Sequence, residues 1–117
     1  MVIYMNMKIS KKKYNTPWHF SSKDIGYIQL KKSGNLNPVN ITEPEMINNI
    51  IKNLENKNYK FKNFNIGNGW TYRILIYSTE GRLKDEFKIN HNNSLRYGFG
   101  VYSYSKMDIS FISDYFE

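Results

Sequence analysis

The chain has 117 residues and a net charge of +7; 40% of its residues are hydrophobic, 23% are charged and none is cysteine. This length predicts a single domain over residues 1–117, because hydrophobic cores usually belong to domains of about 100 to 150 residues. The composition excludes a disordered chain, and the lack of cysteine excludes a disulfide framework and thiolate metal sites.

The N-terminal segment combines a predicted strand with a cluster of lysines. Over residues 2–9, apolar and polar side chains alternate, which is typical of a half-buried strand. A secretory signal has its charges before its apolar run. Here the apolar stretch comes before most of the lysines, so we expect no signal peptide and a cytoplasmic protein. No segment reaches the roughly 18 apolar residues that a membrane-spanning helix needs.

The positive charge is concentrated in the first half of the chain. Residues 1–62 contain 11 basic and 4 acidic side chains, whereas residues 63–117 contain 6 of each. An excess of this kind attracts anionic partners through its long-range field, and it also keeps a solvated loop soluble. We therefore expect a partner of opposite charge on the lysine-rich side of the molecule.

The middle of the chain predicts two strands and then a helix. The strands are expected over 25–32 and 39–41, with the turn-rich sequence SGNLNP between them. Thr42 and Glu45 form a capping box, which predicts a helix over about 43–56. Its apolar residues recur at i, i+3, i+4 and i+7, at Ile47, Ile50, Ile51 and Leu54.

The second half of the chain predicts consecutive antiparallel strands. Alternating segments lie over 59–66, 70–77, 83–89, 95–99 and 101–104. Gly81 supplies the turn between the second and third of these, because glycine adopts positive φ without steric cost. We expect one face of the segment at 70–77 to be core and the other, with Arg73 and Tyr77, to be a contact surface. The aromatic residues expected to build the core are Trp70, Tyr72, Phe87, Tyr97 and Phe99.

The last residues, MDISFISDYFE, place aromatic and aliphatic side chains at helical spacing, with Asp108 as the expected cap. The whole pattern predicts an α+β fold. We expect an antiparallel meandering β-sheet of about five to six strands, packed by one amphipathic α-helix and completed by a short C-terminal helix.

Residues that would indicate an enzyme are scarce. The sequence has no phosphate-binding glycine loop, nucleophile elbow or paired-histidine helix. His19 and His91 could act as base and acid of a metal-free ribonuclease only if the fold brought them together. Asp85 and Glu86 point to opposite faces of a strand, so they cannot act as a carboxylate pair. We expect no catalytic residue, no metal and no cofactor.

A small basic domain that is rich in tyrosine and lacks catalytic groups is most simply a protein-binding domain. Immunity and antitoxin proteins, which inhibit toxins or effectors, are similarly small and lack catalytic motifs. An acidic toxin or effector is therefore the partner in the leading hypothesis. The residues expected to contact the partner are Lys8, Lys11, Lys12, Lys13, Lys60, Lys62, Arg73, Tyr77, Tyr102 and Tyr104.

Two alternatives belong to other classes. Aromatic residues beside arginine on a sheet can stack single-stranded bases, which makes Tyr72, Arg73, Tyr77, Arg96 and Tyr97 a nucleic-acid platform in this interpretation. The other alternative is an extracytoplasmic domain that has lost its signal sequence. The sequence lacks the aromatic signature motifs of the common RNA-binding sheet domains.

Overall fold

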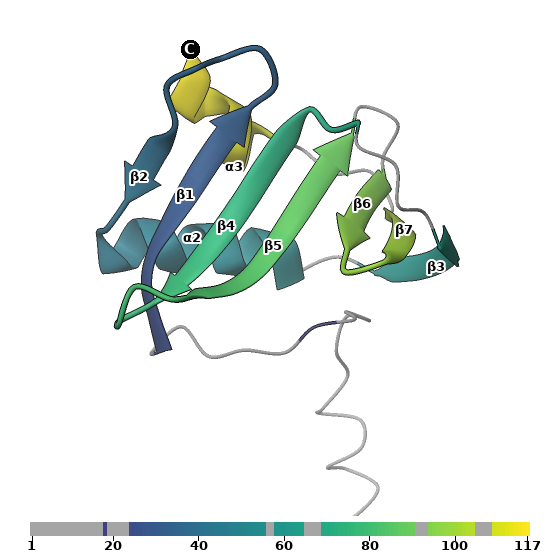
Figure 1. Ribbon diagram of the computed structural model, residues 1–117, viewed down its shortest axis with the longest axis horizontal. Helices are drawn as coiled ribbons and strands as arrows, with labels where there is room; N and C mark the ends of the chain where they lie inside the picture. The colour runs from purple at the N-terminus through teal and green to yellow at the C-terminus, as the bar shows by residue number, and fades with distance from the viewer. Residues whose placement is uncertain (1–17, 19–23, 56–57, 65–68, 91–93, 105–108) are drawn as a thin grey trace, which may run out of the picture.

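The computed structural model describes residues 18, 24–55, 58–64, 69–90, 94–104 and 109–117 (Figure 1). Its strands form one seven-stranded antiparallel sheet in the order β2-β1-β4-β5-β6-β7-β3. The strands are β1 (Ile25–Lys32), β2 (Val39–Ile41), β3 (Tyr59–Phe64), β4 (Tyr72–Ser78), β5 (Leu83–Asn90), β6 (Ser94–Tyr97) and β7 (Gly100–Tyr104). The helices are α2 (Pro44–Glu55), α3 (Ser110–Ser113) and the 3-10 helix η2 (Asp114–Phe116).

These elements confirm the predicted α+β fold, with more strands than the five to six expected. The predicted helix over 43–56 is α2, and the predicted C-terminal helix is the short pair α3 and η2. The strand predicted over 2–9 lies outside the described residues, as does Asp108. The predicted cap at Asp108 is wrong, because the N-cap of α3 is Ile109, which makes no side-chain cap hydrogen bond.

Among the described elements, the helix α2 covers one face of the sheet and none covers the other face. Along the chain, α2 connects the two edge strands β2 and β3, and it passes behind β1, β4 and β5 in Figure 1. Its apolar stripe of Ile47, Ile50, Ile51 and Leu54 is buried. An amphipathic helix that spans the sheet in this way removes one sheet face from water. We call the uncovered face the open face.

The core lies between α2 and the covered face of the sheet. Its central strand residues have no measurable exposure: Ile28, Leu30, Ile74, Phe87, Ile89 and Leu95. Trp18, which is 4% exposed, closes the core with edge-to-face contacts to Phe87 at 4.7 Å and Tyr59 at 4.8 Å between ring centroids. Aromatic pairs at these distances add to the stabilisation that comes from buried area.

Two aromatic residues expected in the core are not there. Phe99 is 72% exposed, because it lies in the turn after Gly98, where the alternation of the strands is interrupted. Trp70 precedes β4 and is only half-buried, with its ring beside Arg73. The alternation that places Tyr72 and Ile74 on the covered face therefore does not extend back to Trp70.

Glycine is required at one position of β1. The register of β1 against β4 shifts between Ile25 and Tyr27, and Gly26 lies at this bulge. A Cβ atom on Gly26 would be 2.4 Å from the carbonyl oxygen of Ser78. The bulge also brings both Ile25 and Ile28 into the core, although simple alternation predicts opposite faces for them.

Three tyrosines at the core have pKa values raised above the usual value of 10. Burial and the neighbouring Tyr104 raise the pKa of Tyr59, whose hydroxyl donates to the carbonyl oxygen of Leu54 at 2.6 Å. Burial, followed by a hydrogen bond to Asp85, raises the pKa of Tyr97 to about 12. Burial alone raises the pKa of Tyr104 to about 12.

These shifts predict that the protein loses stability as the pH rises above about 10. Between about pH 10 and pH 12 the folded tyrosines keep protons that the unfolded chain has released, so stability is complete below pH 10 and falls as the pH rises. Urea midpoints measured across this range should decrease steadily, and Tyr59→Phe should make the decrease shallower because one shifted group is removed. A midpoint that does not change up to about pH 11.5 would contradict the prediction.

Candidate binding face

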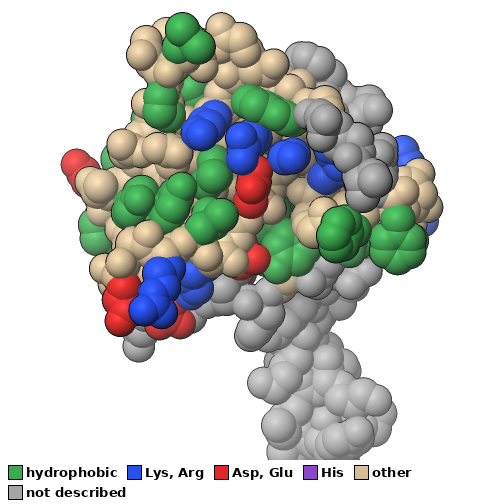
Figure 2. All heavy atoms as spheres, viewed as in Figure 1, with side chains coloured by type: hydrophobic (Ala, Val, Ile, Leu, Met, Phe, Trp, Pro, Cys, Tyr) green, Lys and Arg blue, Asp and Glu red, His purple; other side chains and the backbone are tan. Residues whose placement is uncertain are grey.

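The open face carries a row of positive charges that runs across four neighbouring strands. The members are register partners: Lys31 on β1 lies opposite Arg73 on β4, Arg73 opposite Lys88 on β5, and Lys88 opposite Arg96 on β6. Figure 2 shows blue side chains in a line across this face. Because neighbouring strands lie about 4.8 Å apart, the row is about 14 Å long. We call these four residues the cationic row.

The row is only partly neutralised. Glu86 pairs with Arg73, with an oxygen-to-nitrogen distance of 2.6 Å, and both side chains are about one quarter exposed. No ion pair joins Lys31 or Lys88 to any residue that the structure describes. Like charges directly opposite each other in a sheet are destabilising. The row therefore places like charges opposite each other on neighbouring strands, an arrangement that costs the sheet stability.

Arg96 has a structural position at the end of the row. It is 7% exposed, and its Nη2 donates a hydrogen bond to the carbonyl oxygen of Gly69. This bond holds the segment that leads into β4. The accessible positive charges of the row are thus those of Lys31, Arg73 and Lys88, each half-buried and held at its stem by neighbouring strands.

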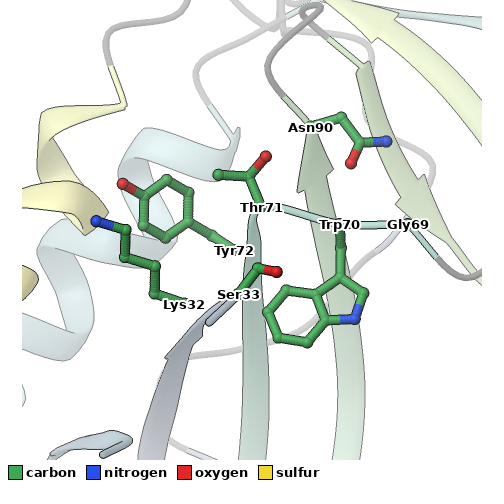
Figure 3. A pocket seen from close by; sticks show the side chains of 7 residues that line it. All are labelled: Lys32, Ser33, Gly69, Trp70, Thr71, Tyr72 and Asn90. Atoms are coloured by element: carbon green, nitrogen blue, oxygen red, sulfur yellow. The ribbon is translucent and has the colours of Figure 1, made fainter. Parts of the chain in front are cut away.

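Trp70 lies at one end of β4, beside the row. The guanidinium carbon of Arg73 is 5.4 Å from the centroid of the indole ring, which is a cation–π contact. Trp70 also lines an open pocket of about 600 Å³ at the end of β1, β4 and β5. In Figure 3, Trp70 points to one side of the strand ends, whereas Lys32 and Tyr72 point to the other. The pocket thus borders both faces of the sheet.

On the other side of the row the open face is aromatic. Tyr27 and Tyr77 are register partners whose rings stack with centroids 4.5 Å apart and an angle of 9° between the planes. Leu83, the register partner of Tyr77 on β5, is 51% exposed. We call these three residues the aromatic patch. It places large apolar area next to the cationic row, and Leu75 lies buried between the two.

The contact residues predicted from sequence do not form one site. Arg73 and Tyr77 lie together on the open face, as expected. Lys60 and Lys62 are exposed on β3, at the far edge of the sheet. Tyr102 is half-buried and packs on Phe61, with ring centroids 5.7 Å apart.

The prediction that Tyr104 is an exposed contact residue is wrong. It is 6% exposed and packs against Tyr59, because its register places it on the covered face of β7. Two members of the proposed nucleic-acid platform, Tyr72 and Tyr97, also belong to the covered face, where Tyr97 stacks on Phe87. The predicted residues outside the described part of the chain are Lys8, Lys11, Lys12, Lys13, His19 and His91.

Sequence reasoning did not predict Lys31, Lys88 or Tyr27 as contact residues, and it assigned Trp70 to the core. Of these, Lys88 lies between the apolar residues Phe87 and Ile89, which was a usable sign of a solvent-facing position. What the alternation could not show is that strands distant in sequence place these residues at the same register. The adjacency of β1 and β4 supplies that information.

Comparison with known proteins does not assign the chain to a family: no family model matches it, and neither curated proteins nor solved structures give a significant match. Within the described segments, no helix is long and apolar enough to cross a membrane. The same segments contain no cluster of His, Asp or Glu side chains arranged to hold a metal ion. A proposal for function therefore depends on the geometry of the open face.

Proposed function

We propose that this protein is a non-enzymatic binding domain whose open face docks an acidic surface of another protein. The observation that carries the proposal is the cationic row, three accessible positive charges at one register beside the aromatic patch. Aromatic residues and arginine are enriched in the centres of protein interfaces, and complementary charge accelerates association. An inhibitor of a toxin or effector, acting as immunity proteins do, is the form of this function that we favour.

Two features of the face favour a protein partner over a single-stranded nucleic acid. Glu86 lies beside the cationic row and pairs with Arg73, and its carboxylate would repel phosphate groups. Tyr27 and Tyr77 each cover one ring face of the other, so they offer less ring surface for bases to stack on. A carboxylate beside cations and stacked tyrosines suits a partner surface that presents both acidic and polar groups.

Copurification from the cells that encode the protein, at about 50 and 300 mM salt, would test this function. We expect a protein partner to be retained at low salt and weakened at high salt. In parallel, random single-stranded RNA and DNA should show no binding, whereas the phosphate-binding alternative requires strong affinity that falls steeply with salt. Failure to retain any protein, together with tight binding of RNA, would overturn the proposal.

A further inference from the structure

The edge strand β3 is a second exposed feature, separate from the open face. It stands at the end of the sheet, and within the described residues it pairs with β7 alone. Five of its six residues, from Lys60 to Phe64, are exposed. The opposite edge strand, β2, has only three residues and follows Pro38. Short edges next to proline resist the pairing of a further strand, whereas an edge with five exposed residues allows it.

The side chains on β3 combine positive charge with exposed aromatic rings. Phe61 is 52% exposed and Phe64 is 77% exposed, and their rings contact each other at 4.8 Å between centroids. Phe64 is the register partner of Gly100, so the exposed Phe99 lies beside the same edge. Exposed apolar side chains that cluster in this way mark interaction sites in soluble proteins. In Figure 2, hydrophobic side chains gather at this end of the sheet.

Lys60 and Lys62 determine which strand this edge can accept. No acidic residue lies on β3 or on its neighbour β7. If β3 paired with β3 of a second copy, lysines from both copies would meet across the junction, and the net charge of +7 on each copy would oppose the approach. The edge is therefore protected against self-association, while the same lysines attract a strand that carries carboxylates.

We propose that β3 accepts an extended acidic segment of another protein. This segment would pair with β3 as one more strand beside the seven described strands. Main-chain hydrogen bonds to the exposed edge from Lys60 to Phe64 would give affinity, and side chains would give selectivity. The register of β3 against β7 shifts between Phe61 and Asn63, so regular alternation of the side chains ends at Phe61. The added segment would place acidic residues beside Lys60 and Lys62 and apolar residues beside Phe61. The ligand class is thus an extended peptide in which acidic and apolar residues alternate.

A synthetic peptide of about eight residues that alternates glutamate with valine would test the proposal, with binding measured by fluorescence anisotropy. We expect binding, and no binding of a peptide in which lysine replaces glutamate. Two further peptides carry N-methyl groups on alternate residues, in opposite sets. The peptide that is methylated on the N–H groups facing β3 must lose binding, and the other methylated peptide must retain it. The reason is that only one of the two alternating sets of N–H groups donates to the sheet edge. Equal effects of the two sets would overturn the proposal.

Variants of the protein locate the site. Lys60→Glu combined with Lys62→Glu should weaken the glutamate peptide by about tenfold or more and favour the lysine peptide, since each opposite-charge pair contributes up to about 1 kcal/mol. These side chains are exposed, so the fold should be unaffected. The matched control, Lys31→Glu with Lys88→Glu, reverses the same number of charges in the cationic row. If the control weakens the peptide and the β3 variant does not, the edge site is excluded while the proposed function of the open face stands.

Discussion

Replacement of Phe87 by alanine is expected to lower the free energy of unfolding by about 3 to 5 kcal/mol. Phe87 has no exposed surface, and it touches Trp18 at 4.7 Å and Tyr97 at 5.0 Å between ring centroids. Its removal leaves a cavity between the centre of the sheet and Trp18. Because domains of this size are stable by about 5 to 15 kcal/mol, the variant loses a large part of its stability.

Phe99→Ala is the matched control for this prediction. It makes the same chemical change at a site that is 72% exposed, and exposed substitutions usually alter stability by less than about 0.5 kcal/mol. Urea unfolding of both variants, followed by circular dichroism, compares them directly. Similar losses in the two variants would contradict the location of Phe87 in the core and of Phe99 in a solvent-facing turn.

The same two residues show how far the sequence could predict the fold. Alternation alone assigned both to the core, and it was correct for Phe87 because β5 continues regularly through it. Phe99 follows Gly98, which has a φ of 62° and lies in a turn. In a turn, odd and even positions no longer correspond to the two faces of the sheet. Helical spacing predicted α2 to within one residue at each end, since four buried apolar residues and an N-terminal capping signal agree there.

The candidate site was less predictable for a physical reason. Arg73 and Tyr77 could be assigned to an outward face from β4 alone, but the cationic row also needs β1 beside β4. The hairpin between β4 and β5 is local, whereas β1 pairs with β4 across α2 and β3 in the chain. Strand order in a sheet depends on such long-range packing, which one sequence does not reveal. Tyr104 was misjudged for a related reason, since only the pairing of β7 with β3 shows which face it occupies.

The cationic row leads to a prediction in which stability and binding change in opposite directions. Lys31→Gln combined with Lys88→Gln removes two like charges that flank Arg73 across the strands. Cross-strand pairs contribute about 0.2 to 1 kcal/mol each, so relief of the repulsion should raise the urea midpoint of the free protein slightly. Lys52→Gln, on the exposed side of α2, is the control and should leave binding near the wild-type value. Because Lys52 lies in the last turn of α2, its loss should lower stability slightly rather than raise it.

For the partner retained in copurification, the same double variant should bind about a hundredfold more weakly or worse. Hydrogen bonds to charged groups contribute about 1.5 to 3 kcal/mol each, and two are lost. A core residue behaves differently, because its loss weakens folding and binding together. If the cationic row serves only binding, its like charges lower the stability of the free protein. The double variant should then be more stable than the wild type although it binds more weakly. If the variant were less stable than the wild type and bound normally, the row would be a structural feature of the sheet, and the open face would not be the docking surface.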